Sequence, residues 1–310
     1  MKAVDVKALE KRFGETVALE PATFSVDEGE LFGLIGPDGA GKTTLFRMLA
    51  TLVLPTAGQA TVDGLDVVDD YRELRNRLGY MPGKFALYQD LTVAENLDFF
   101  ASIFGTTIES NYEMIRDIYG QLEPFRKRRA GALSGGMKQK LALSCALIHR
   151  PRVLLLDEPT TGVDAVSRLE FWDVLTRLRD SGLTILVSTP YMDEAARCDR
   201  VALIQNGRIL EINTPGGIED SYPLPLLSVK TADRLQAKRA LERFPFAHSV
   251  FPFGEELHFT DSRSESSVSE IKGWLGQEGV VNAEVAVIRA GIEDVFMHRM
   301  LAVESEVPAA

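Results

Sequence analysis

A glycine-rich string between an apolar run and a helical pattern constrains the fold of this chain more than any other feature. Residues 36–43 read GPDGAGKT and match the phosphate-binding pattern GxxxxGK[ST]. The apolar run 31–35 before the string predicts a buried strand, and the pattern KTTLFRMLATL predicts a helix from Gly41. In such a strand–loop–helix unit, glycine amides surround a phosphate group and the helix N-terminus adds positive potential. The sequence therefore predicts an α/β domain that holds a phosphorylated ligand.

The expected phosphate contacts lie in this loop and in the first helical turn. Lys42 is expected to reach the β- and γ-phosphate oxygens and to take part in catalysis. Thr43 is expected to place its hydroxyl on Mg²⁺. The complete predicted set is Gly36, Pro37, Asp38, Gly39, Ala40, Gly41, Lys42, Thr43 and Thr44.

Two acidic residues end a second apolar run. Residues 153–157 read VLLLD, and Glu158 follows directly. Adjacent side chains at a strand end point to different sides, so one carboxylate can face a metal ion while the other faces water. We expect Asp157 to bind Mg²⁺ together with Thr43. Glu158 is expected to be the catalytic residue that polarises the attacking water or accepts its proton.

A third string, LSGGMKQ at residues 133–139, offers a second phosphate site. Ser134 is expected to cap a helix whose first turn holds Gly135 and Gly136, so that a hydroxyl and bare amides lie at a positive helix end. The string resembles the LSGGQ element of ABC ATPases, which in that family completes the nucleotide site of the opposite subunit. The resemblance therefore implies a head-to-tail dimer that holds two molecules of ATP, with Mg²⁺, between its domains.

The resemblance to ABC ATPases covers roughly residues 3–220. It implies a P-loop NTPase fold of the α/β class for residues 1–220, with an antiparallel β layer and a helical subdomain at about residues 88–150. The residue pattern agrees with this fold, because residues 2–30 alternate in short runs typical of antiparallel strands.

Four further residues are singled out by pattern or by resemblance. Thr92 and Glu95 have the spacing of a capping box, which predicts the start of an amphipathic helix. Phe13 matches the family's adenine-stacking aromatic residue. Asp164 ends the string TTGVD, which in the family touches the partner subunit beside the nucleotide.

The apolar runs 183–188 and 201–204 follow residues 153–157 with a helical pattern between them, which is typical of a parallel sheet. The pair Asn206-Gly207 then predicts a tight hairpin turn.

The last third of the chain predicts a separate small domain. Residues 213–225 are rich in Gly and Pro and are expected to form a linker. Residues 221–310 are expected to form an α+β domain of order βαββαβ with a short helix, in which residues 303–310 are a tail or part of a linker. This domain is similar to the accessory domain of the NatA-like and YbhF-like branch, whose members export drugs or ions. Because some members fuse two ATPase domains, the chain is either a whole subunit or one half of such a pair.

Two positions depart from the family pattern. The family usually reads YMPQ where this chain has Tyr80-Met81-Pro82-Gly83, and STHYMDEA where this chain has Pro190 in place of histidine. The resemblance assigns the glutamine to Mg²⁺ and the attacking water, and the histidine to the γ-phosphate. Losing one donor to developing charge typically costs about 10²- to 10³-fold in rate. We therefore expect a site that binds ATP tightly and hydrolyses it slowly.

Composition bears on the partners. The net charge of −11 argues against nucleic-acid binding, because phosphate-backbone affinity needs clustered Lys and Arg. No run approaches the roughly 20 apolar residues that span a membrane. Cys145 and Cys198 lack metal-binding spacing and are expected to be buried thiols. We expect a cytoplasmic protein that lies peripherally on the inner membrane.

The expected partners are a second ABC ATP-binding domain, identical or different or fused, and an ABC-type membrane permease subunit. The contact surface for the permease is expected at Phe85, Leu87, Tyr88 and Leu91. Two alternatives stay open: a soluble ABC protein without a transport role, and a nucleotide sensor that does not hydrolyse ATP.

Overall fold

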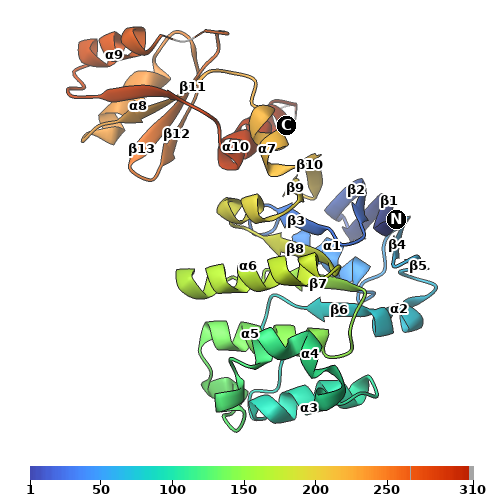
Figure 1. Ribbon diagram of the computed structural model, residues 1–310. Coiled ribbons are helices and arrows are strands. Elements are labelled where there is room, and N and C mark those ends of the chain that lie inside the picture. The colour runs from blue at the N-terminus through green and yellow to red at the C-terminus, as the bar shows by residue number, and fades with distance from the viewer. Residues whose placement is uncertain (266, 307–310) are drawn as a thin grey trace. The chain divides into compact units, whose positions relative to one another are not determined.

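The computed structural model of the protein describes residues 1–265 and 267–306. The chain separates into two compact units, of which the first ends at Gly216 and the second begins at Gly217. This boundary lies inside the short helix α7 (Pro215–Asp220), and the boundary expected after residue 220 lies at the end of that helix. The first unit holds two sheets and the second unit one, and each unit is described by itself (Figure 1).

A six-stranded sheet of order β10-β9-β3-β8-β7-β6 lies in the first unit. The pairs from β9 to β6 are parallel, and the edge strand β10 runs antiparallel to β9. Strands β3, β7 and β8 are buried along their whole length, which is why they read as largely apolar runs. The strands are β3 (Leu31–Ile35), β6 (Leu78–Met81), β7 (Val153–Asp157), β8 (Thr184–Thr189), β9 (Arg200–Gln205) and β10 (Arg208–Asn213).

The turn between β9 and β10 is the predicted hairpin. Asn206 and Gly207 both have positive φ, 49° and 79°, as a type I′ turn requires. This turn also positions part of the site, because the Gly207 N–H donates to the Ala40 carbonyl at 2.9 Å.

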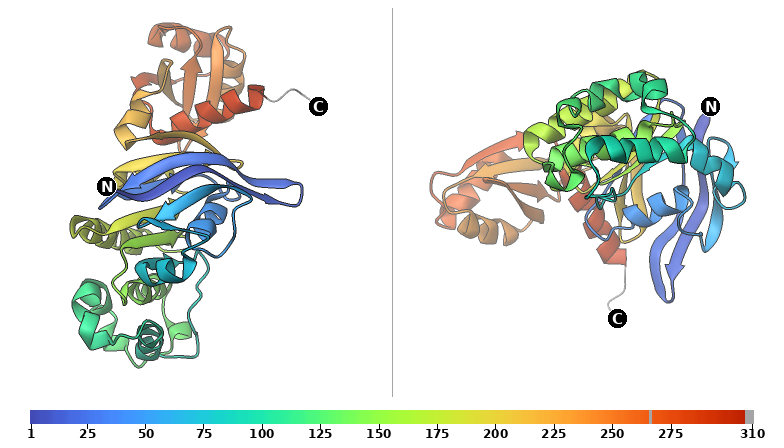
Figure 2. Two further views of the ribbon diagram at one scale, coloured as in Figure 1. Left: turned by 90° about the vertical axis from the view of Figure 1, so that its right-hand side faces the viewer. Right: turned by 90° about the horizontal axis from the view of Figure 1, so that it is seen from below.

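A four-stranded antiparallel sheet of order β2-β1-β4-β5 covers the first unit on another side, and the left view of Figure 2 shows its long β1–β2 hairpin. One hydrophobic core joins the two sheets, with Phe24 of β2 stacked on Phe32 of β3 at a ring distance of 5.5 Å. The strands of this layer are β1 (Lys2–Phe13), β2 (Thr16–Asp27), β4 (Ala57–Val62) and β5 (Leu65–Asp66).

Three helices, α3 to α5, form a separate group beyond the β6 edge of the large sheet (Figure 1). The predicted capping box opens α3: Thr92 Oγ1 accepts from the Glu95 N–H at 3.2 Å, and the Glu95 carboxylate accepts from the Thr92 N–H at 2.8 Å. No helix among residues 1–265 and 267–306 is both long and apolar enough to cross a membrane. The helices of the first unit are α1 (Lys42–Leu49), α2 (Tyr71–Arg77), α3 (Val93–Ile103), α4 (Ile108–Tyr119), α5 (Gly135–Leu147) and α6 (Ala165–Asp180).

The second unit holds an antiparallel sheet of order β12-β13-β11-β14 and has the predicted order βαββαβ, followed by a helix. Its elements are β11 (Leu226–Lys230), α8 (Arg234–Glu242), β12 (Ala247–Phe253), β13 (Glu256–Asp261), α9 (Val268–Gln277), β14 (Glu284–Ile288) and α10 (Ile292–Glu306).

Two sequence predictions in this region were wrong in detail. The expected linker 213–225 contains helix α7, in which Ile218 is fully buried. The expected tail begins inside α10, which continues to Glu306, and residues 307–310 lie outside the described part of the chain.

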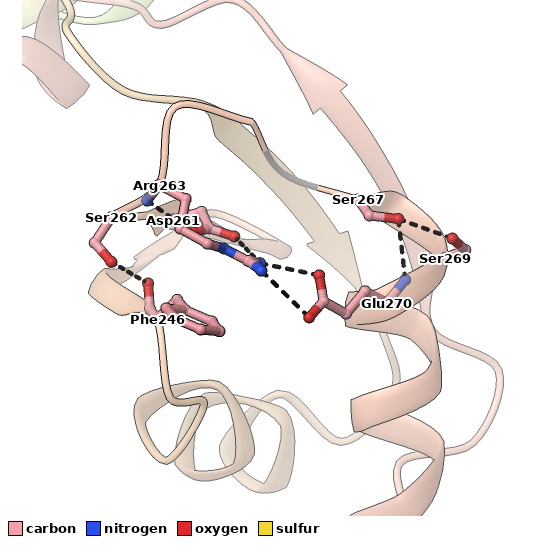
Figure 3. Close-up of polar contacts among 7 residues, drawn as sticks. All are labelled: Phe246, Asp261, Ser262, Arg263, Ser267, Ser269 and Glu270. Carbon is pink, nitrogen blue, oxygen red and sulfur yellow. Dashed lines mark hydrogen bonds and ion pairs between the residues drawn. The ribbon is translucent and has the colours of Figure 1, made fainter.

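An arginine joins the end of β13 to α9 in the second unit (Figure 3). Arg263 donates to both carboxylate oxygens of Asp261, at 3.0 and 2.7 Å, and to Glu270 of α9 at 2.9 Å. Its guanidinium lies over the Phe246 ring, 4.1 Å from the centroid. Because Asp261 is fully buried, this pairing compensates a charge that would otherwise be costly to bury.

Candidate functional site

The loop that joins β3 to α1 has two positions, Gly36 and Gly41, at which the backbone of a neighbouring strand leaves no room for a Cβ atom. A Cβ atom at Gly36 would lie 2.1 Å from the Ile204 carbonyl oxygen. Gly41 has φ of 103°, and a Cβ atom there would lie 2.7 Å from the Ala18 carbonyl oxygen. These contacts hold the loop against β2 and β9 and position the first turn of α1.

Lys42 is almost completely buried beneath this loop, with 2% of its surface exposed. Its Nζ donates to the Gly36 carbonyl at 2.7 Å and to the Pro37 carbonyl at 2.9 Å, and lies 3.0 Å from Glu158 Oε1. A buried ammonium needs such partners, and here they fix its position in the centre of the loop.

A cavity of about 380 Å³ opens beside the loop. It contains the expected residues Gly39 to Thr44 and Glu158, while Gly36, Pro37 and the exposed Asp38 belong to the same loop but do not line it. Its remaining wall was not predicted as part of the site and comes from β2 and the β9–β10 turn. The residues of this wall are Thr16, Val17, Ala18, Asn206 and Gly207.

Phe13 lies at the tip of the β1–β2 hairpin and is 53% exposed. It pairs across the hairpin with Thr16, which lines the cavity, and Lys11 Nζ lies 4.8 Å from the centroid of its ring. Phe13 does not itself line the cavity, but an exposed aromatic ring beside a lining residue is available for stacking on a planar ligand.

The carboxylate of Asp157 ends β7 and is 2% exposed. Its Oδ1 accepts from Thr43 Oγ1 at 3.1 Å and from Ser188 Oγ at 2.7 Å. Hard oxygen atoms of this kind suit Mg²⁺, which usually takes one or two carboxylates together with phosphate oxygens and water. The part of the chain that the structure describes holds no cluster of three His, Cys, Asp or Glu side chains able to bind a metal. Because they offer one carboxylate and one hydroxyl in contact with each other, Thr43 and Asp157 fit Mg²⁺ bound together with a phosphate.

Glu158 has a positive φ of 51°, which is uncommon for a residue with a side chain. Its N–H is held by the carbonyl and the hydroxyl of Ser188, at 3.1 and 3.0 Å. Asp157 thus contacts Thr43 while Glu158 contacts Lys42, so the two adjacent acids have different partners. Ser188 begins the string in which Pro190 departs from the family pattern, but the sequence analysis assigned it no role.

Both departures from the family pattern lie at this site. A Cβ atom at Gly83 would lie 3.0 Å from the Asp157 carbonyl oxygen and 3.7 Å from Glu158 Cβ. Pro190 follows Thr189, whose carbonyl accepts from the Gly36 N–H at 3.2 Å. Neither residue brings a polar side-chain group to the site.

The residues expected to serve a partner's nucleotide form a second cluster. Ser134 caps α5 and accepts from the Met137 N–H at 3.4 Å, and a Cβ atom at Gly136 would lie 2.7 Å from Ser167 Oγ of α6. Asp164 caps α6 by accepting from the Ser167 N–H at 3.0 Å, a bond that lowers the pKa of the Asp164 carboxyl. A Cβ atom at Gly135 would lie 3.3 Å from the carbonyl of Gly162, two residues before Asp164. This cluster does not line the cavity beside Lys42.

The two cysteines are outside both clusters. Cys145 and Cys198 are free and buried, as predicted, and burial raises the pKa of both thiols. They are therefore poor nucleophiles.

Comparison with known proteins identifies the family. Residues 19–161 match the ABC transporter family. The chain is 42% identical over 232 residues to the probable multidrug ABC transporter ATP-binding protein YbhF of Escherichia coli (strain K12), a match that covers 72% of this chain and 40% of that protein. It is 35% identical over 303 residues to the daunorubicin resistance ATP-binding protein DrrA2 of Streptomyces coeruleorubidus, covering 95% of this chain and 94% of the relative.

Further similarity extends to Nod factor export ATP-binding protein I of Burkholderia lata, at 36% identity over 298 residues, 95% of each chain. Among solved structures, an ATP-binding subunit of an ABC transporter is similar with a TM-score of 0.65 and 28% identity, covering 71% of this chain and 93% of that one. A dimeric ATP-binding cassette in a post-hydrolysis state with ADP and Pi gives a TM-score of 0.62 at 25% identity, covering 68% of this chain and 98% of that one.

These matches confirm the predicted fold class and the resemblance to the YbhF-like branch. They extend along 95% of the chain for the relatives of similar length. The protein therefore belongs to the family of ABC transporter ATP-binding proteins.

Proposed function

We propose that this chain binds ATP with Mg²⁺ in the cavity beside Lys42 and serves as the ATP-binding subunit of an exporter of drugs or ions. The observation that carries the proposal is the buried Lys42 ammonium, fixed beneath a loop whose Gly36 and Gly41 leave no room for side chains. Backbone amides and a fixed cation at a helix N-terminus suit a polyphosphate. Thr43 and Asp157 would hold Mg²⁺, which neutralises part of the phosphate charge.

The second cluster supports pairing with another ATP-binding domain. Ser134, Gly135, Gly136 and Asp164 lie at the N-termini of α5 and α6 and do not line the cavity of their own chain. A similar cassette with ADP and Pi is dimeric. We infer that this cluster covers the nucleotide of a partner domain, whether that domain is a second copy, a different chain or a fused half.

Hydrolysis is proposed to be slow. Glu158 is placed to accept a proton from an attacking water, because its carboxylate borders the cavity beside Lys42. Gly83 and Pro190 lie close to the same groups and supply no donor, and each missing donor costs about 10²- to 10³-fold in rate. These two residues also keep a non-hydrolysing nucleotide sensor as a second candidate function.

A groove in the first unit supports the proposed contact with a membrane subunit. Phe85 and Leu87 line a largely apolar cavity of about 590 Å³, together with residues of α2, β6, α3 and α5. Tyr88 is 51% exposed beside it and packs edge-on against Phe99 at a ring distance of 5.0 Å. Leu91 is partly buried. We propose that the permease contacts this surface and keeps the chain on the cytoplasmic face of the inner membrane.

The test combines binding and association. Equilibrium dialysis with labelled ATP and Mg²⁺ is expected to show one nucleotide per chain, lost in Lys42→Ala and retained in the exposed-site control Lys84→Ala. Light scattering is expected to show that Glu158→Gln dimerises on addition of MgATP, and that adding Ser134→Arg prevents the dimer without preventing nucleotide binding. Nucleotide binding that survives Lys42→Ala unchanged would contradict the proposal.

A further inference from the structure

A buried carboxylate is bonded to Thr160, close in sequence to the candidate catalytic residue Glu158, and the sequence analysis gave it no role although it lies in the string 188–195 that contains Pro190. Glu194 belongs to the 3-10 helix Met192–Arg197 and is 3% exposed. Its Oε2 accepts from the hydroxyls of Thr160, at 3.1 Å, and Thr189, and its Oε1 accepts from Arg168 Nε at 3.1 Å. A buried charge of this kind is tolerated because both of its oxygens are bonded.

The three donors to Glu194 belong to three different segments of the site: the segment after β7, the end of β8 and the start of α6. Thr160 lies two residues after Glu158. Thr189 ends β8 and precedes Pro190, and its carbonyl accepts from the Gly36 N–H at 3.2 Å. Arg168 lies in the first turn of α6, and its N–H donates to the Asp164 carbonyl at 2.9 Å. One carboxylate therefore joins the segments that carry Glu158, Pro190 and Asp164.

The connection to Thr160 bears on the backbone of Glu158. A residue with a side chain stays at positive φ, here 51°, when its surroundings hold it there. On one side Ser188 holds the Glu158 N–H, and on the other side the Thr161 N–H donates to the Glu158 carbonyl at 3.2 Å. The turn that this second bond closes contains Thr160, and the bond from Thr160 Oγ1 to Glu194 fixes that residue in turn. Since Gly83 and Pro190 supply no polar side-chain group to orient a water molecule, the placement of Glu158 decides how well this site can act.

Arg168 completes the arrangement from the other side. Its guanidinium donates to the exposed Asp193 at 3.0 Å and lies over the Tyr191 ring, 4.2 Å from the centroid. Arg168 thus holds the segment after Pro190 against α6. Asp193 has 75% of its side chain exposed, so its pair with Arg168 contributes little by itself.

We propose that Glu194 is a positioning residue, which holds Glu158 in the backbone conformation that directs its carboxylate toward the cavity. This inference rests on the proposed function, because it assumes that Glu158 acts on ATP. Displacing a reacting group by about 1 Å costs about 100-fold in rate. Glu194 does not line the cavity, so we infer that it acts through Glu158.

The test is a double-mutant cycle on single-turnover ATP hydrolysis by the full chain. Glu194→Gln keeps the shape of the side chain and removes its charge. It is expected to lower the single-turnover rate about 10- to 100-fold, while the dissociation constant for ATP stays within about 2-fold. In a Glu158→Gln background the same change is expected to have no further effect, because Glu194 acts through Glu158. The matched control Asp193→Asn is expected to retain the parent rate and affinity.

Four outcomes decide the matter. A rate loss in Glu194→Gln that is equally large in the Glu158→Gln background would overturn the positioning role, as would an equal loss of ATP affinity. A chain that binds ATP but shows no single-turnover hydrolysis would also overturn it, and would leave the nucleotide-binding part of the proposed function intact. A chain that binds no ATP would overturn the proposed function itself. Thermal unfolding of each variant, expected within a few degrees of the parent, separates a local effect from loss of the fold.

Discussion

Lys42 Nζ lies 3.0 Å from Glu158 Oε1, although the two residues belong to distant parts of the sequence. This contact joins the loop after β3 to the end of β7 and places the candidate catalytic carboxylate at the wall of the cavity that Lys42 closes. Lys42 and Glu158 are thus positioned together, whereas the site lacks polar side chains at positions 83 and 190.

Restoring those side chains is expected to raise turnover. The double variant Gly83→Gln with Pro190→His is predicted to hydrolyse ATP about 100-fold faster or more, because each change adds a donor close to the phosphate site. Position 83 is tight, since a Cβ atom there lies 3.0 Å from the Asp157 carbonyl oxygen. Gly83→Ala therefore serves as the control for the steric cost and is expected to give no gain. Steady-state phosphate release measures all three, and no gain in the double variant would contradict a site weakened by these residues.

Gly136 is expected to tolerate no side chain. Gly136→Ala would place a Cβ atom 2.7 Å from Ser167 Oγ and 2.8 Å from Ser167 Cβ, so α5 and α6 must separate. Overpacking of this kind costs about 1–3 kcal/mol in the free energy of unfolding. The neighbouring Gly135→Ala is the matched control, because its Cβ atom lies 3.3 Å from the Gly162 carbonyl oxygen and meets no side chain. Urea denaturation measures both, and equal stabilities would show that this packing is looser than the structure indicates.

Alkaline pH is expected to destabilise the first unit through Tyr80. Burial, with a smaller contribution from the negative charge of Asp157, raises the pKa of Tyr80 from 10.0 to about 12. The unfolded chain therefore loses this proton at lower pH than the folded chain, so the contribution of Tyr80 to stability is complete below pH 10 and is lost between about pH 10 and 12. Urea denaturation across this interval is expected to show a shallower decline for Tyr80→Phe than for the parent. Identical slopes would contradict the assignment, and Tyr71→Phe, at an exposed ring, is the control.

Tyr88 is expected to contribute to binding of the membrane subunit. Its backbone is fixed to α3 by the fully buried Asn96, which accepts from the Tyr88 N–H and donates to its carbonyl, both at 3.0 Å. The exposed ring is therefore presented on a rigid support. Tyr88→Asp is expected to abolish copurification with a multispanning membrane protein, whereas Tyr88→Phe is expected to retain it. ATP binding, measured on the same samples, should stay unchanged in both, and copurification that survives Tyr88→Asp would place the contact elsewhere.

Local patterns in the sequence were sufficient for much of this protein. The buried strand before Gly36, the helix after it and the capping box at Thr92 follow from residue periodicity and from hydrogen bonds within a few residues, so each can be read without knowledge of the rest of the chain. The same holds for the Asn206-Gly207 turn, because its backbone conformation suits these two residues. Helix α7 was missed because Gly and Pro dominate the local sequence pattern there. The helix is stabilised by the burial of Ile218, which depends on tertiary packing and not on neighbouring residues in the sequence.

The sequence by itself determined which chemical groups this protein carries: a glycine loop with Lys42, two acids after a buried strand, and a serine followed by two glycines. Tertiary structure decided which of these groups meet. It placed Ser188 on the carboxylate of Asp157, Glu194 behind Glu158, and Ser134 away from the cavity of its own chain. The physical reason is that these contacts join segments that lie far apart along the chain, so they depend on strand order and helix packing, which local periodicity does not encode.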